Sequence, residues 1–391
     1  MKTPGLRIIV LGFIVRGPLG GMAWSNLEYL RALRRLGHDV FFAEDSGDYP
    51  GCVDPSTNLT DTDPSYGLKF AAQALSGIGF GDRWVYHDAH TGRWLGPCAN
   101  SIELICRSAD VVLNLCGVNP LRSWLAAVPV RILVDEDPVF TQVRHLTDPP
   151  ALAAAREHNA FFTFAENFGQ CGCRVPQDGL PWRPTRQPVV LQDRAVAPGV
   201  PEGTFTTVML WQSYEPCEYQ GVRYGLKAAS FPRYMDLPQR VEGPFELAMG
   251  GADVPTEELT RMGWRLRNGT EITLDVPTYE SYIRNSKGEF SVAKHGYTVS
   301  RSGWFSERSV MYLATGRPVI LEDTGFSAWM KTGEGILPFT NADEAAAAVE
   351  NVHSQYERHC RKARQAAEEY FDSRQVLTRL LDEAREAAAS Q

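Results

Sequence analysis

At 391 residues the chain exceeds what a single hydrophobic core usually contains, so we expect two domains. Its hydrophobic content of 43% and charged content of 22% are those of an ordinary soluble globular protein. With 39 basic and 47 acidic residues the formal net charge is −8, which argues against nucleic acid as a general partner. The sequence has no run of 18 apolar residues, so no integral membrane segment is expected.

The amino-terminal half begins like a nucleotide-binding α/β unit. The pattern predicts a strand over residues 7–11, a glycine-rich loop over 12–21, a helix over 22–36 and a second strand over 40–43. The apolar run at residues 6–15 leads into the glycine loop without a cleavage site, so it indicates a strand rather than a signal peptide. We therefore expect a cytoplasmic protein.

Later strands in this half are predicted at residues 111–115, 130–134 and 161–164, each followed by polar or glycine-rich residues. Strands separated by helical stretches favour a mostly parallel sheet. Residues 46–100 are rich in Asp, Gly, Pro and Thr and have few clean periods, so we expect a long irregular insertion there. The one close cysteine pair, Cys171 and Cys173, is weak evidence for zinc, and reduced thiols are the favoured interpretation.

A proline-dense stretch over residues 170–203 suits a connection between domains. A second α/β unit then begins with a predicted strand at 205–210. A further strand at 245–249 runs into Gly250 and Gly251, and a short strand is predicted at 264–267. Residues 279–284 suggest a short helix, and the end of the chain, from about residue 343 to 391, has the composition of helices.

The most informative segment runs from Ser300 to Phe326. Ser306 is a good helix N-cap, and Glu307 suits the positive end of the helix dipole. Gly316 ends the predicted helix, and an apolar strand follows at residues 318–321. A helix N-terminus flanked by Arg301 and Arg308 is typical of an anion site, and Glu322-Asp323-Thr324-Gly325 would lie at the carboxyl end of the strand, where open α/β sheets bind ligands.

This segment resembles the donor-binding segment of GT-B glycosyltransferases, which transfer a sugar from a nucleotide diphosphate. Gly303-Trp304-Phe305-Ser306 is similar to the Gly-Trp-Asn-Ser of the plant-type motif, although the spacing to Gly316 is two residues longer. Residues 314–319, 20–24 and 33–40 are similar to segments of bacterial members. Met311 stands where the family usually has a ribose-binding Glu, and Glu307, one turn earlier, is the candidate to replace it.

The resemblance implies two doubly wound Rossmann-like α/β domains that face each other across a cleft. It implies an acceptor-side domain at residues 1–195, a nucleotide-sugar-binding domain at 196–365 and a carboxyl-terminal helix at 366–391 that crosses back to the first domain. The implied donor-binding residues are Gly250, Gly251, Trp264 with the base pocket as far as Arg267, Lys294, Arg301, Ser302, Gly303, Ser306, Glu307, Arg308, Asp323, Thr324 and Gly325. Gly20, Gly21 and Met22 are the implied acceptor-binding residues.

A catalytic base is required if the transfer inverts the anomeric carbon, and it should lie at a strand end of the first domain. Asp137 is the first choice because the proline after it fixes its direction, and Glu44 is the second. Asp135, Asp45 and Glu166 also fit by position. If the transfer retains configuration, the leaving diphosphate takes the proton and no base is needed; the sequence leaves both open.

No metal and no resident cofactor are expected. Residues 135–137 superficially match the metal-binding D-x-D of another glycosyltransferase architecture, but the donor signal here lies in the carboxyl-terminal half. In metal-free GT-B enzymes, cationic side chains and helix dipoles neutralise the leaving diphosphate. The nucleotide sugar, with UDP among the expected nucleotides, is a co-substrate.

The predicted function is therefore transfer of a sugar to a hydroxyl or amine of a small-molecule acceptor. One alternative is an NAD(P)-dependent oxidoreductase with Glu44 on the adenosine ribose, although Gly12, Gly17, Gly20 and Gly21 do not give the G-x-G-x-x-G spacing. The others are a GT-B-like nucleotide-sugar epimerase, a non-catalytic binding protein and an unrelated α/β enzyme with a plain helix–strand unit.

Overall fold

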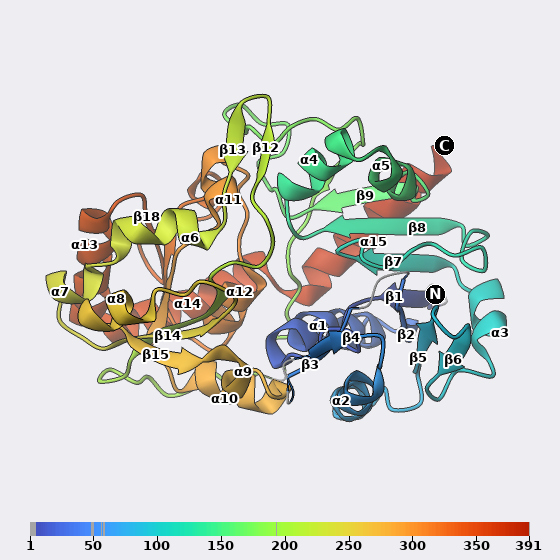
Figure 1. The fold of residues 1–391 in the computed structure, drawn as a ribbon, viewed down its shortest axis with the longest axis horizontal. Coiled ribbons are helices and arrows are strands. Elements are labelled where there is room, and N and C mark those ends of the chain that lie inside the picture. Colours follow the sequence, from blue (N-terminus) through green and yellow to red (C-terminus); the bar gives the residue numbers. More distant parts are fainter. Residues whose placement is uncertain (1–4, 48–50, 56, 58, 193, 391) are drawn as a thin grey trace.

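The protein has two lobes, each built around its own parallel sheet (Figure 1). This computed structural model describes residues 5–47, 51–55, 57, 59–192 and 194–390. The sheet of the first lobe lies within residues 7–184 and that of the second within residues 205–339, so the predicted boundary at 195/196 falls between them. The first strand, β1, and the last helix, α15, both lie at the first lobe (Figure 1).

The first sheet has eight strands, all parallel to their neighbours except β6, which runs antiparallel to β5. The chain starts in the middle at β1, moves outward over β2 and β5, and then returns to β7 on the other side of β1. The connection therefore changes direction between β1 and β7, which is where open α/β sheets bind ligands. In spatial order the strands are β10 (Arg183–Pro184), β9 (Ala160–Thr163), β8 (Val130–Asp135), β7 (Val111–Leu115), β1 (Arg7–Leu11), β2 (Asp39–Asp45), β5 (Trp84–Asp88) and β6 (Arg93–Leu95).

The second sheet has six strands, all parallel, and it reverses in the same way between β11 and β16. In spatial order they are β15 (Arg265–Asn268), β14 (Phe245–Gly250), β11 (Phe205–Leu210), β16 (Gly288–Ser291), β17 (Val319–Glu322) and β18 (Ile336–Phe339). Two small hairpins complete the strands: β3 (Cys52–Asp54) with β4 (Leu59–Asp61), and β12 (Cys217–Tyr219) with β13 (Val222–Tyr224).

The central strands of each sheet are buried on both faces because helices cover the sheets. In the first lobe the helices are α1 (Gly20–Arg35), α2 (Ser65–Ser76), α3 (Ile102–Arg107), α4 (Phe140–Thr147) and α5 (Pro149–Ala155). In and after the second sheet they are α6 (Lys227–Ser230), η1 (Phe231–Tyr234), α7 (Leu237–Arg240), α8 (Thr256–Arg261), α9 (Gly269–Ile272), α10 (Val276–Arg284), α11 (His295–Ser300), α12 (Glu307–Ala314), η2 (Phe326–Ala328), α13 (Ala342–Ser354) and α14 (Tyr356–Tyr370). The last is α15 (Ser373–Ala389).

Helix α15 returns to the first lobe, as predicted, and packs against α1, β8 and β9 (Figure 1). Its apolar side chains, among them Leu377 and Leu381, belong to the same buried cluster as Val10 and Ile132 of the first sheet. The predicted helical end of the chain extends to Gln391, which lies outside the described residues. The predicted two-lobed parallel architecture is confirmed in its sheets and in this crossing helix.

The expectation of an irregular insertion at residues 46–100 is wrong for a large part of the segment. The structure places β3, β4, α2, β5 and β6 there. All five residues of β5 are buried, although His87 and Asp88 at its end are polar. Tertiary partners make this possible, since His87 pairs with Asp45 of β2 at 2.7 Å, and such partners are invisible to a periodicity argument.

A buried carboxylate joins the two lobes. Glu28 of α1 is almost inaccessible to solvent and accepts hydrogen bonds from the backbone N–H of Val190 at 2.6 Å and from Arg194 at 2.9 Å. Arg194 also binds Glu280 of α10 at 2.9 Å, and its guanidinium lies over the ring of Trp24. The first lobe, the connection and the second lobe therefore meet at one ion network.

Replacing Arg194 with Met should destabilise the protein by about 3 kcal/mol, because it removes the main cation from the buried carboxylate of Glu28. Arg107→Met is the matched control, since its ion pair with Glu103 is exposed and should contribute at most about 0.5 kcal/mol. The measurement is the free energy of urea unfolding followed by tryptophan fluorescence. Equal effects of the two substitutions would contradict the importance of the network.

Candidate functional site

The carboxyl edges of the two sheets face each other across a cleft, and Asp137 is where they touch. Asp137 follows β8 of the first lobe and binds the ammonium of Lys294 at 3.0 Å. The hydroxyls of Tyr214 and Tyr297 also donate to it, so three donors of the second lobe converge on this carboxylate. The structure thus brings together the predicted base, Asp137, and the predicted donor-binding Lys294, but as partners of each other.

The predicted donor loop lies at this contact. Gly303 adopts a left-handed φ of +78°, and a Cβ there would lie 2.8 Å from the side chain of Asn167, so the position requires glycine. The Asn167 amide donates to the backbone carbonyls of Arg301 at 3.2 Å and Gly325 at 2.9 Å, and its N–H donates to the carbonyl of Ser302. One asparagine of the first lobe therefore ties together both predicted donor loops of the second.

A narrow recess lies between the carboxyl ends of β16 and β17 and the amino end of α12. The Ser306 hydroxyl caps the helix by accepting from the backbone N–H of Arg308 at 3.2 Å, as its sequence predicted. The side chain of Arg308 forms the floor, where it binds Glu289 at 2.6 Å, Ser291 at 2.8 Å and the carbonyl of Val208 at 2.9 Å. Ser306, Arg308 and Thr324 are the predicted residues that line the recess.

Two predicted donor residues use their polar groups within the second lobe. Trp264 is buried in the core of that lobe, where its indole N–H donates to the carbonyl of Met235 at 2.7 Å and its ring packs on Phe231. Asp323 accepts from the N–H of Gly325 at 2.8 Å and from the Ser327 hydroxyl, so it stabilises the turn at the end of β17. In both cases neighbouring residues satisfy the polar groups of the side chain.

The remaining predicted positions are spread along the edges of the two sheets. Gly250 ends β14, and Gly251 follows it with a φ of +94°. Gly20 and Gly21 open α1 but pack against α10: the Gly20 N–H donates to the carbonyl of Thr273, and a Cβ on Gly20 would lie 2.2 Å from a carbonyl oxygen. Met22, one residue further, is exposed.

Glu44, the second candidate base, is buried and held by its neighbours. Its carboxylate accepts three backbone N–H groups, from Ile14 and Val15 at 2.7 Å and from Arg16 at 2.8 Å. Burial raises the pKa of Glu44 despite the charge of Arg16 and these hydrogen bonds. This carboxylate organises the glycine-rich loop after β1.

The other positional candidates are also paired. Asp135 accepts from Gln142 at 2.9 Å and Thr163 at 2.7 Å. Burial raises the pKa of Asp135, and these hydrogen bonds oppose the rise. Asp45 binds Arg122 and His87, and Glu166 binds Arg186.

Lys227, which the sequence did not single out, is the most unusual cation of the site. It opens α6, is 8% exposed, and has no hydrogen-bond or ion-pair partner among the described residues. Burial lowers the pKa of Lys227 well below its usual range, and the nearby Arg308 lowers it further. Its segment has no periodicity and no motif, so only the tertiary structure reveals it.

A second missed group is Glu322, at the carboxyl end of β17. It lines the recess and accepts from Arg233 at 2.7 Å, the hydroxyl of Tyr234 at 3.1 Å and the N–H of Ala293 at 3.1 Å. Burial raises the pKa of Glu322, while Arg233 and these hydrogen bonds lower it. The sequence analysis named the neighbouring Asp323 as a donor-binding residue, but Glu322 is the carboxylate that lines the recess.

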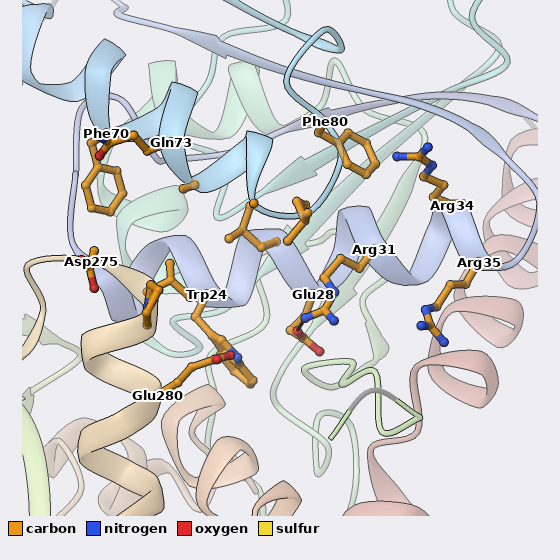
Figure 2. Close-up of a pocket in the computed structure, with 16 residues that line it drawn as sticks. Trp24, Glu28, Arg31, Arg34, Arg35, Phe70, Gln73, Phe80, Asp275 and Glu280 are labelled. Carbon is orange, nitrogen blue, oxygen red and sulfur yellow. Dashed lines mark hydrogen bonds and ion pairs between the residues drawn. The ribbon is translucent and has the colours of Figure 1, made fainter. Parts of the chain in front are cut away.

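A groove of about 680 Å³ lies away from the strand edges, between α1, α2 and α10 (Figure 2). Arg34 and Arg35 lie at one end of it and Trp24, Asp275 and Glu280 at the other (Figure 2). None of the predicted site residues lines this groove. We therefore centre the site on the cleft.

Within the described ranges, no group of three or more His, Cys, Asp or Glu side chains is arranged to hold a metal ion. In the same part of the chain, none of the helices combines the length and apolar character needed to span a bilayer.

No family model and no curated protein matches this sequence. Solved structures do match over nearly the whole chain. An alpha-glucosyltransferase in complex with UDP-glucose and DNA containing an abasic site is 9% identical, with a TM-score of 0.59 over 97% of this chain and 100% of the other. The chain has the GT-B fold.

Two further matches support this assignment of fold. AviGT4, a glycosyltransferase involved in avilamycin A biosynthesis, is 12% identical, with a TM-score of 0.53 over 99% of each chain. Anabaena Alr3699/HepE, in complex with UDP and glucose, is 11% identical, with a TM-score of 0.54 over 96% of this chain and 98% of the other. At such identities the likeness concerns the fold.

Replacing Lys227 with Met should raise the melting temperature of the nucleotide-free protein, by about 2–4 °C for each kcal/mol that the buried charge costs. Below the pKa of Lys227 in the folded protein, the side chain is charged in both the folded and the unfolded state, and the buried charge destabilises the protein fully. This destabilisation decreases as the pH rises towards 10.5, the ordinary pKa of lysine. The gain should therefore be larger at pH 7 than at pH 10. Lys362→Met, at a partly exposed lysine of α14, is the control. A lower melting temperature of Lys227→Met at pH 7 would contradict the argument.

Proposed function

We propose that the protein is a glycosyltransferase that moves a sugar from a nucleoside diphosphate, UDP being the first to test, to a hydroxyl or amine of an acceptor. The observation that carries this proposal is Lys227, a buried cation that has no hydrogen-bond or ion-pair partner among the described residues and that lies close enough to Glu307 and Arg308, in the capped first turn of α12, to interact with their charges. A diphosphate is the ligand that such a site fits, because it supplies the missing negative charge. Structures of the same fold that contain UDP or UDP-glucose support the choice.

The diphosphate is proposed to bind at the amino end of α12. The N–H groups of its first turn and the hydroxyls of Ser302 and Ser306 would donate to the phosphate oxygens, and Lys227, Lys294 and Arg301 would balance their charge. Arg308 supports the site from below, since its own donors are engaged by Glu289 and its neighbours. Positive groups placed in advance around a leaving diphosphate stabilise the charge that develops on it.

The sugar and the nucleobase of the donor would lie on either side of the diphosphate. Glu322 and the turn at residues 323–325 are proposed to meet the sugar hydroxyls, because both lie at the carboxyl end of β17. Glu307 remains the proposed partner of the ribose. The nucleobase of the donor would lie at the carboxyl ends of β14 and β15, near Gly250, Gly251 and the exposed end of β15.

The acceptor is proposed to be a small molecule that enters along the first lobe, past the loops after β1 and β7 and the start of α1 at residues 20–22. A net charge of −8 works against a polyanionic acceptor, although one protein of the same fold was solved with DNA. We propose a metal-independent transfer on the strength of the cations above, which activity in excess EDTA would test. All eight cysteines are free, which suits a reducing compartment such as the cytoplasm.

The rival reading as an oxidoreductase is disfavoured by Glu44. That residue would have to bind the ribose of the dinucleotide, but its carboxylate is occupied by three N–H groups of the glycine-rich loop. An epimerase and a binding protein of the same shape differ from a transferase in their products. Mass spectrometry of a reaction with a UDP-sugar and a panel of small acceptors distinguishes the three.

Lys227→Met should weaken UDP binding by about 10–100-fold in calorimetry, because it removes one charge-assisted contact to the diphosphate. The control Lys362→Met, at a partly exposed lysine on α14, should bind UDP like the unmodified protein. An affinity of Lys227→Met within twofold of the unmodified protein would refute the proposed diphosphate site.

Asp137→Asn should strengthen UDP binding by about threefold to tenfold, because Lys294 no longer has to leave a partly exposed carboxylate to reach the diphosphate. The measurement is again calorimetry, with the transfer rate recorded in parallel. If the UDP affinity is unchanged and the transfer rate falls by about 100-fold, the sequence-based hypothesis of Asp137 as base is favoured instead.

A further inference from the structure

The turn after β7 places a thiol at the point where the first sheet reverses direction. Cys116 and Gly117 have consecutive left-handed φ values of +59° and +61°. Non-glycine residues rarely adopt this conformation, and such strain is concentrated at functional sites. The Cys116 thiol is exposed to the cleft and donates to a carboxylate oxygen of Glu136 at 2.8 Å.

Glu136 lies directly opposite the proposed donor site. Its backbone carbonyl accepts the indole N–H of Trp304 at 3.0 Å, and Trp304 belongs to the loop that leads into α12. The Trp304 ring stacks on Tyr297, with centroids 4.2 Å apart. Glu136 is therefore fixed across the cleft from the amino end of α12, where the reacting carbon of a bound donor would lie.

Glu136 differs from the other carboxylates at the strand ends because one of its oxygens accepts no hydrogen bond from the described residues. Its side chain is only partly buried, and among the described residues it has one hydrogen-bond donor, the Cys116 thiol. The carboxylates of the neighbouring strand ends each accept two or more hydrogen bonds or lie in an ion pair; they are Glu44, Asp45, Asp135, Asp137 and Glu166.

The surroundings of Glu136 suit a group that changes protonation near neutral pH. Burial, together with repulsion from Glu307 of α12 and from Asp135 and Asp137 of its own strand end, raises the pKa of Glu136 to about 7 although the Cys116 hydrogen bond opposes the rise. Tyr29 faces the same cluster from α1 with a buried, unpartnered hydroxyl.

The thiol is suited to its role as donor, because its sulfur lies 2.8 Å from a carboxylate oxygen of Glu136, which can only accept when it is ionised.

We propose that Glu136 is the acceptor-binding carboxylate: its free oxygen receives the hydrogen bond of the acceptor's attacking hydroxyl or amine, and the Cys116 thiol positions it. This inference rests on the proposed transferase function and assigns the acceptor side of the same cleft. It replaces Asp137, whose two oxygens are engaged by Tyr214, Tyr297 and Lys294, as the carboxylate that meets the acceptor.

The first test compares Glu136→Gln with Asp137→Asn, which remove neighbouring carboxylates. Transfer is first established with the unmodified protein and a UDP-sugar; if no transfer occurs, the proposed function fails and this inference with it. Glu136→Gln should lower kcat/KM for the acceptor by about 10–100-fold while the UDP affinity stays within twofold. A smaller loss than that of Asp137→Asn, or a loss of UDP affinity, overturns the inference and leaves the transferase function standing.

The second test uses the pH dependence of kcat/KM for the acceptor, which a merely structural role would not shift in opposite directions. In the unmodified protein it should fall below about pH 7, because protonated Glu136 is a poor hydrogen-bond acceptor. Cys116→Ala should move this fall to higher pH, Cys116→Ser should restore it, and Glu307→Gln should move it to lower pH because a repelling charge is lost. Unchanged profiles in Cys116→Ala and Glu307→Gln overturn the assignment.

Discussion

The geometry of the cleft depends on one buried carboxylate, that of Glu28. An ionised group out of water is stable only when its hydrogen bonds are made, and here two of the donors, Val190 and Arg194, come from the interlobe connection. Arg194 also binds Glu280 of α10. A shift of α1 against the second lobe would therefore leave the buried carboxylate of Glu28 without this partner. The two sheet edges are thereby held at the distance at which Asp137 reaches Lys294.

The cleft contains several groups whose burial, conformation or pairing is energetically unfavourable or unusual in the folded protein. Lys227 is buried and has no partner in the part of the chain that the structure describes, Cys116 occupies a strained conformation, and Asp137 accepts from three donors of the opposite lobe. Arg308, at the floor of the recess, shows the reverse, since each part of its guanidinium has a partner. This contrast separates residues that await a ligand from residues that support the fold.

Much of the architecture follows from the sequence because parallel strands buried on both faces are continuous apolar runs. The strands at 111–115 and 205–210 have the predicted bounds, and Ser306 caps its helix as expected. The strand β16 was missed because Glu289 lies inside it, and that charge is buried only through Arg308, nineteen residues away. Lys227 and Glu136 could not be found for a related reason: their significance lies in the partners they lack, and an absent contact leaves no pattern in a sequence.

The return of α15 to the first lobe has a consequence for how the protein is made. The first sheet is complete once residue 184 has been synthesised, but the face over β8 and β9 is closed by Leu377, Leu380 and Leu381, which leave the ribosome almost two hundred residues later. During that interval the nascent first lobe exposes an apolar surface that only the end of its own chain can cover. The two lobes therefore cannot mature one after the other, and a chain that stops before α15 loses the cover of the lobe that was made first.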